Sequence, residues 1–168
     1  FDLEKVLMVA SVASMIDQFN MSNIDILRGM GYEVHVAANF KSGNTSSNSR
    51  MAQFQEELSE LNVPYFQIDF SRSVTDLRSN LRAFRQLLDL IRRHRYRFIH
   101  CHSPIGGVCG RFAGRMTSTP VVYTAHGFHF YRGAPLLNWL LYYPVERLLA
   151  RYTDLLITIN KEDYARAR

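Results

Sequence analysis

The chain has 168 residues, a length that usually folds as one domain with a sizeable hydrophobic core. Hydrophobic residues make up 47% of it and charged residues 21%, both close to the averages of globular proteins, which argues against a disordered or fibrous chain. No apolar run reaches the ~18 residues of a membrane span, and the apolar start is too short for a signal peptide, so the sequence favours a cytoplasmic location. The two cysteines, Cys101 and Cys109, make no disulfide framework and are expected to be reduced.

Basic residues outnumber acidic ones by 20 to 15, for a net charge of +5, and all but three of the basic residues are arginine. Arginine binds phosphates and carboxylates through two parallel hydrogen bonds. Residues 72–97 contain eight arginines, which are offset by Asp76 and Asp89 alone. This local excess indicates an anionic partner, such as a membrane surface or a nucleic acid, although a solvated helix face would have the same composition.

Strands and helices alternate along the whole chain. Short apolar runs predict buried strands, and apolar residues at three- and four-residue spacing predict helices. Gly31 marks the end of the first helix, since glycine commonly follows the last helical residue. In chain order we expect a strand at 5–10, a helix at 14–30, a strand at 33–38, a loop at 39–49, a helix at 51–61, a strand at 64–68, a helix at 74–94, a strand at 98–101, a helix at 103–115, a strand at 121–125, a helix at 136–151 with a break at Pro144, a strand at 155–159 and a helix at 161–168.

This alternation predicts an α/β fold, a Rossmann-like doubly wound parallel sheet of six or more strands with helices on both faces. The expected strand order is 3-2-1-4-5-6. Ligands of such sheets bind beyond the carboxyl ends of the strands, which directs attention to six loops at residues 11–17, 39–49, 69–73, 102–107, 126–133 and 160–163.

The chain lacks two common glycine-rich motifs that bind nucleotides. The loop after the first strand contains no glycine, so the dinucleotide fingerprint G-x-G-x-x-G is absent, and so is the P-loop. A nicotinamide or flavin enzyme is therefore disfavoured. The helix at 103–115 contains Gly106, Gly107, Gly110 and Gly114, which would weaken a free helix and so indicate close packing or close approach of a ligand.

Histidines and cysteines cluster after the fourth and fifth strands. The spacing of His100, Cys101 and His102 does not fit a structural zinc site, and we expect no metal. A cysteine nucleophile is disfavoured, because both cysteines fall where burial is expected. His126 ends the fifth strand beside Gly127, where it either donates a hydrogen bond to a substrate or serves a structural role.

Four segments of the chain resemble one known family: FIHCHSPIGGVCGR (98–111), VYTAHGFHFY (122–131), NWLLYYPVE (138–146) and TDLLITINKED (153–163). Together they resemble the N-terminal half of family four of the retaining glycosyltransferases, which have the GT-B fold, and more narrowly its bacterial capsule and exopolysaccharide branch. The resemblance covers nearly the whole chain, from Lys5 to Ala167.

The resemblance implies two Rossmann-like domains that face each other across a cleft. Residues 1–168 would form the N-terminal, acceptor-side domain, and the donor-binding domain would be absent from this chain, leaving it inactive alone. The implied reaction moves a hexose-type sugar, with retention, from a nucleotide sugar to a lipid-linked saccharide in surface polysaccharide synthesis. The nucleotide sugar is a substrate, and no cofactor or metal is implied.

The resemblance also assigns residues by position. His126 matches the histidine that contacts the transferred sugar, and the first-strand loop lies under the donor diphosphate, although Ser-Val-Ala-Ser stands here where many members have Gly-Gly. The implied catalytic residue is His126, and the implied substrate-binding residues are Ser11, Ser14, Ser103, Gly106, Gly107, Gly127, Asn160 and Glu162.

Two chemical routes and two other functions stay open. Front-side displacement needs no nucleophile, whereas a covalent intermediate needs a carboxylate, for which Asp17 is the nearest candidate. The alternative to an enzyme is a non-catalytic module that docks on an acceptor or on the inner leaflet of the cytoplasmic membrane through a stripe of four arginines. A nucleic-acid partner is disfavoured, because no aromatic platform or helix-turn-helix pattern is present. The stripe consists of Arg78, Arg82, Arg85 and Arg92.

Overall fold

The computed structural model describes residues 2–102 and 104–168. Its strands are β1 (Lys5–Val12), β2 (Glu33–Asn39), β3 (Tyr65–Gln67), β4 (Phe98–His102), β5 (Val121–Ala125) and β6 (Leu155–Thr158). Its helices are α1 (Ala13–Phe19), α2 (Met21–Gly29), α3 (Asn48–Glu60), α4 (Leu77–His94), α5 (Ile105–Thr117), α6 (Leu136–Ala150) and α7 (Lys161–Ala167).

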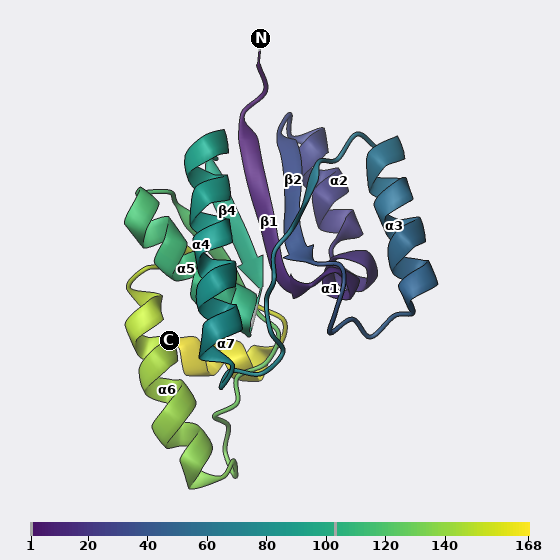
Figure 1. The fold of residues 1–168 in the computed structure, drawn as a ribbon. Coiled ribbons are helices and arrows are strands. Elements are labelled where there is room, and N and C mark those ends of the chain that lie inside the picture. The colour runs from purple at the N-terminus through teal and green to yellow at the C-terminus, as the bar shows by residue number, and fades with distance from the viewer. Residues whose placement is uncertain (1, 103) are drawn as a thin grey trace.

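The strands form one six-stranded parallel sheet in the order β3-β2-β1-β4-β5-β6 (Figure 1). The predicted doubly wound fold and its strand order are therefore confirmed. Alternate strand residues face two separate cores, which explains why the strands are apolar on both sides. Leu7 and Ile99 pack on the side of α4 and α5, and Met8 and Val36 pack on the side of α1, α2 and α3.

Two predicted helices differ from those observed. The helix expected at 14–30 is divided at Asn20, whose backbone leaves the helical region (φ −124°, ψ 0°) and whose side-chain amide donates to the Met15 carbonyl at 3.1 Å. Asparagine competes with helix in this way because its side chain hydrogen-bonds nearby backbone. The break expected at Pro144 is wrong, since α6 continues through it. Pro144 lies on the exposed side of α6, where the carbonyl that loses its N–H partner can bind solvent.

Close packing accounts for the glycines of α5. A Cβ added at Gly107 would lie 2.5 Å from Cε2 of Tyr123, and one added at Gly106 would lie 3.0 Å from the Ser11 amide nitrogen. The first distance is shorter than real Cβ contacts and the second is tighter than nearly all of them, so the start of α5 lies directly against β1 and β5. Of the two explanations that the sequence left open, the described residues support packing.

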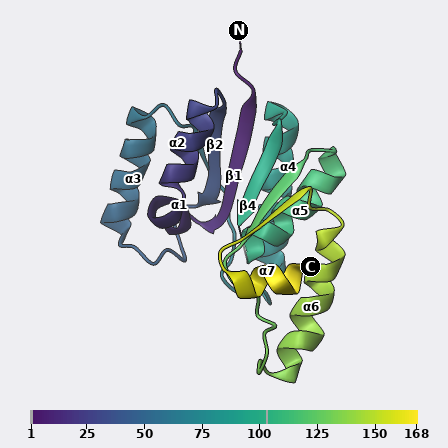
Figure 2. The same cartoon turned by 180° about the vertical axis from the view of Figure 1, so that it is seen from behind.

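The carboxyl ends of the strands meet at one edge of the sheet, and α6 extends beyond this edge, away from the rest of the molecule (Figure 1, Figure 2). Helices α1, α2 and α3 cover one face of the sheet near β1 and β2. On the same face β6 is more open, because Leu155 and Ile157 are exposed. In the described ranges, no helix combines the length and the apolar character needed to cross a membrane.

Candidate active site

Two adjoining pockets open at the carboxyl edge of the sheet. The histidine pocket has a volume of about 570 Å³ and is lined by Met15, Phe19, Asn20, Asn23, His100, His102, Thr124, His126, Ile157 and Ile159. The serine pocket has a volume of about 260 Å³ and is lined by Ser11, Val12, Ser14, Met15, Gln18, Phe19, Thr45, Arg72, Pro104 and Ile105. Met15 and Phe19 of α1 line both pockets, so the two are neighbours.

Three histidines form a row along the histidine pocket. His100 and His102 lie two residues apart on β4 and therefore share a face of the sheet, with ring centroids 4.5 Å apart. His102 Nδ1 lies 2.9 Å from His126 Nε2, and His100 Nε2 lies 2.8 Å from Thr124 Oγ1. These contacts hold the ring of His126 in one orientation beside the pocket.

His102 carries an unusual polar atom. Its side chain is 1% exposed, and its Nε2 has no hydrogen-bond partner among the described residues. A buried polar atom without a partner costs roughly 1–3 kcal/mol, so such atoms are few and usually have a functional explanation. Because His102 lines the histidine pocket, this unpartnered atom lies at the candidate site.

Burial keeps the three imidazoles neutral. It lowers the pKa of His102 to about 2 and the pKa of His100 to about 4, and it also lowers the pKa of His126. A neutral imidazole has one donor and one acceptor nitrogen, so His102 and His126 share a single proton across their contact. The row is thus suited to orient and hydrogen-bond hydroxyl groups.

The buried histidines predict a loss of stability in mild acid. The unfolded chain binds protons at a histidine pKa near 6.5, whereas the folded chain resists protonation until pH falls to about 4 at His100 and about 2 at His102. The free energy of unfolding should therefore decrease as the pH falls below 6.5. For each histidine the decrease is about 1.4 kcal/mol per pH unit between its pKa in the unfolded chain and its pKa in the folded chain. Urea unfolding at a series of pH values between 7.5 and 4.5 measures this slope.

A variant tests whether the buried histidines cause this dependence of the unfolding free energy on pH. His102→Gln should make the fall in unfolding free energy shallower, because one buried group no longer titrates. His129→Gln is the matched control, since it removes an exposed histidine of the neighbouring loop. Equal slopes for His102→Gln and the unchanged protein would contradict the assignment.

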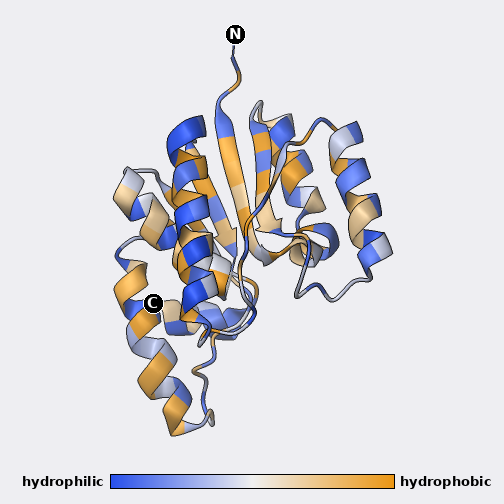
Figure 3. Ribbon diagram, viewed as in Figure 1, coloured by the Kyte–Doolittle hydropathy of each residue, from blue (hydrophilic) through white to orange (hydrophobic). Residues whose placement is uncertain are grey.

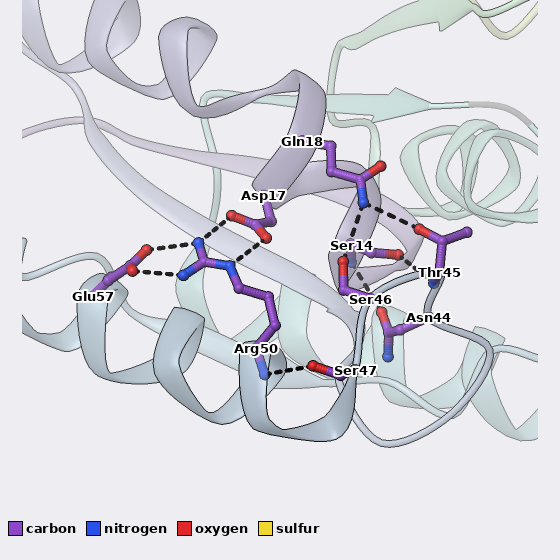
Figure 4. Close-up of polar contacts among 9 residues, drawn as sticks. All are labelled: Ser14, Asp17, Gln18, Asn44, Thr45, Ser46, Ser47, Arg50 and Glu57. Carbon is purple, nitrogen blue, oxygen red and sulfur yellow. Dashed lines mark hydrogen bonds and ion pairs between the residues drawn. The ribbon is translucent and has the colours of Figure 1, made fainter.

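The structure places Ser11 and Ser14 at the serine pocket, where their hydroxyls already have protein partners. Ser11 Oγ accepts from the Gly106 amide at 2.9 Å, and Ser14 Oγ accepts from the Thr45 amide at 3.1 Å. Asn44 Oδ1 in turn accepts from the Ser14 amide at 2.9 Å (Figure 4). The loop between β2 and α3 is thereby fastened over the start of α1.

Asp17 faces α3. Its carboxylate accepts from Arg50 Nε at 2.9 Å and Nη2 at 2.5 Å, and the same guanidinium binds Glu57 (Figure 4). Asp17 lines neither pocket. It is therefore poorly placed to attack a sugar bound at His126.

The other predicted site residues are spread around the same edge. Gly106 and Gly107 are buried in the first turn of α5, and Gly127 is exposed with a positive φ of 129°. Asn160 caps α7 by accepting from the Asp163 amide, and Glu162 pairs with Arg166 on the same helix. Ser103 lies outside the described residues.

Both cysteines have the structural role expected of them. Cys101 and Cys109 are buried, and burial raises the pKa of each thiol to about 12. A thiol that holds its proton so firmly is a poor nucleophile. Within the described ranges, no three side chains of the ligating types converge on a metal position.

The sequence interpretation missed the contact between His102 and His126, although a signal for it existed. His102 pairs with Thr124 in the β4–β5 register, and His126 follows two residues later on the same face. The His-x-His pattern at the end of β4, next to a histidine at the end of the adjacent strand β5, would have indicated this row of histidines.

Comparisons with known proteins fit this architecture. Residues 20–168 match the family described as the glycosyl transferase 4-like domain. EpsD of Bacillus subtilis (strain 168), which is named provisionally as a glycosyltransferase, is 44% identical over 168 residues, covering 98% of this chain and 40% of EpsD. The UDP-Gal:alpha-D-GlcNAc-diphosphoundecaprenol alpha-1,3-galactosyltransferase of Escherichia coli is 33% identical over 85 residues, covering 50% of this chain and 22% of that protein.

Solved structures share the fold at low identity. The S. aureus MnaA–UDP co-structure superposes with a TM-score of 0.68 at 12% identity, covering 97% of this chain and 41% of that one. The crystal structure of Acinetobacter baumannii MurG has a TM-score of 0.61 at 16% identity, covering 92% of this chain and 40% of that one.

The parallel sheet with pockets at its carboxyl edge thus defines a Rossmann-like domain of the GT-B type. The chain belongs to the family of glycosyl transferase 4-like domains, and the resemblance seen in its motifs is confirmed. It spans 40% of the length of EpsD.

Proposed function

We propose that this chain is the acceptor-side part of a glycosyltransferase that moves a sugar from a nucleotide sugar to a lipid-linked saccharide in surface polysaccharide synthesis. The observation that carries the proposal is the row of neutral histidines at the carboxyl edge of a family member's sheet. The name of the E. coli relative supports the substrate classes, because it specifies a UDP sugar as donor and a diphosphoundecaprenol-linked sugar as acceptor.

In the proposed reaction, His126 hydrogen-bonds a hydroxyl of the transferred sugar in the histidine pocket. The donor diphosphate lies over the serine pocket, beside Ser11, Ser14 and the basic side chain of Arg72. The acceptor approaches past Pro104 at the start of α5. Gly127 lies in the loop after β5, Asn160 caps α7, and Glu162 lies in the first turn of α7, all near the carboxyl edge of the sheet.

We propose front-side displacement with retention, in which the leaving diphosphate departs on the face that the acceptor enters. The position of Asp17 supports this route over a covalent intermediate, because Arg50 and α3 hold its carboxylate away from the histidine pocket. In this route the negatively charged leaving diphosphate stays on the same face as the positive charge that develops on the sugar ring and stabilises it, while the neutral histidines orient the sugar hydroxyls.

A transfer assay with the intact, longer protein tests this function. Radiolabelled nucleotide sugars are supplied with an undecaprenyl diphosphate-linked sugar in detergent, and the expected product is a labelled lipid with the donor's anomeric configuration. EDTA should leave the rate unchanged, since no resident metal is proposed. Failure of every donor, in a preparation that still binds the acceptor, would favour the non-catalytic binding module instead.

We also propose that the protein works at the cytoplasmic face of the membrane as a peripheral protein, since a lipid-linked acceptor is held there. The arginine stripe of α4 supports this, because all four of its members are exposed and none makes an ion pair with another described residue. The stripe is Arg78, Arg82, Arg85 and Arg92.

A further inference from the structure

Helix α6 is apolar on the side that faces away from the protein. Leu137 and Leu140 are 63% and 64% exposed, and Leu136 and Leu141 are exposed as well. Figure 3 shows apolar turns along α6, which extends beyond the carboxyl edge of the sheet. A helix that is apolar on all sides is normally buried, so this surface indicates a partner that covers it.

The same surface continues across a groove to the start of α4. This apolar groove has a volume of about 450 Å³, and its lining includes Val74 and Leu77 on one side and Leu141 and Val145 on the other. Leu77 is 75% exposed. Pro104 and Ile105 line both this groove and the serine pocket, so the groove adjoins the candidate active site.

Exposed arginines lie near these apolar residues in the sequence. Arg132 precedes α6, and Arg78 and Arg82 belong to the first two turns of α4, next to Leu77. Asp76 is the acidic residue nearest to them in the sequence, and its carboxylate accepts from the Ser79 amide at 3.2 Å. Leucines flanked by arginines match an anionic lipid surface, in which apolar side chains enter the boundary of the acyl chains and basic ones meet the headgroups.

Helix α6 is joined firmly to the loop that carries His126. The ring of His129 lies 4.5 Å from that of Tyr142, and Phe130 lies 5.5 Å from Trp139. Asn138 donates to the His129 carbonyl at 3.0 Å. A surface that α6 touches is therefore held at a fixed position relative to the active-site loop.

We infer that the first two turns of α6 and the first turns of α4 form a membrane-docking face that rests on an anionic bilayer. The face consists of Val74, Leu77, Leu136, Leu137, Leu140 and Leu141, with Arg78, Arg82 and Arg132 around it. This inference deepens the proposed function and rests on its lipid-linked acceptor: docking here brings the bilayer to the groove beside the serine pocket.

The length of α4 limits which arginines can contact the bilayer. Helix α4 runs from the carboxyl edge of the sheet towards its opposite end (Figure 1). Arg92 lies 14 residues after Arg78, about 21 Å further along α4. This exceeds the Debye length of about 8–10 Å at physiological salt. The docking face therefore narrows the proposed membrane contact of the arginine stripe to its near end, Arg78 and Arg82, and does not use Arg92.

Vesicle binding of the intact protein tests the inference without donor or acceptor, so the result does not depend on transferase activity. Vesicles of phosphatidylcholine alone are compared with vesicles that also contain phosphatidylglycerol. Leu137→Gln with Leu140→Gln should weaken binding to the anionic vesicles about tenfold. Arg78→Gln with Arg82→Gln should weaken it about fivefold per arginine at low salt and less at high salt.

Matched variants complete the test. Ile26→Gln with Met30→Gln, which changes exposed apolar residues of α2 and its cap, and Arg92→Gln with Arg93→Gln should both leave binding unchanged. Equal losses from the near and far arginine pairs would overturn the inference. It would also be overturned if the leucine variant melted at a lower temperature while binding vesicles normally, because another part of the longer protein would then cover α6.

Discussion

Replacing His126 with alanine is expected to lower the turnover of the intact protein by roughly one to three orders of magnitude, or about 1.4–4 kcal/mol of transition-state stabilisation. His126 lines the histidine pocket, and its ring is oriented through the 2.9 Å contact with His102. An oriented neutral imidazole can strengthen its hydrogen bond to the sugar as charge develops in the transition state. Alanine removes that bond but leaves the sheet and both cores intact.

Two measurements distinguish this role from a structural one. The kcat and KM of transfer should show the loss mainly in kcat, and the melting temperature should change little, since His126 is only half-buried. His129→Ala is the matched control, because it removes a histidine of the same loop that faces Tyr142. A large drop in melting temperature with normal turnover would show that His126 is structural.

The fold was predictable because its signals are local and periodic. Apolar runs and helical spacing located every strand and every helix except that α1 and α2 were predicted as one, and the chirality of parallel crossovers limited the order of the strands. What the sequence did not show were features set by distant partners. The hydroxyls of Ser11 and Ser14 accept from the amides of Gly106 and Thr45, 95 and 31 residues away, and no local pattern reports such contacts.

Helix α6 illustrates a second limit. Its sequence predicted a break at Pro144, because proline removes a helical hydrogen bond. That loss is small when the affected carbonyl can reach solvent, and whether it can depends on which side of the helix is covered. No amphipathic stripe in the sequence of α6 answers this, since α6 is apolar both where it is packed and where it is exposed.

Replacing Glu146 with leucine is expected to destabilise the protein by about 3–5 kcal/mol, because it removes the carboxylate that pairs with the buried Arg111. Arg111 has a side chain that is 1% exposed, and its two terminal nitrogens donate to Glu146 at 2.8 and 3.0 Å. Its Nε donates to the Gly107 carbonyl, and its guanidinium lies 3.7 Å from the ring centroid of Tyr123. Without Glu146, this cation stays buried and uncompensated.

A second variant separates the buried charge from other effects of the change. Arg111→Met combined with Glu146→Leu removes both charges and should recover most of the lost stability, because a buried ion pair contributes little beyond an apolar pair of similar size. Glu57→Leu breaks the pairing of Glu57 with Arg50 near the surface (Figure 4) and should cost much less, since Arg50 still pairs with Asp17 and is partly exposed to solvent. Urea unfolding measures all three. If the double variant were as unstable as Glu146→Leu alone, the loss would come from the packing of α6 against α5 and not from the unpaired guanidinium.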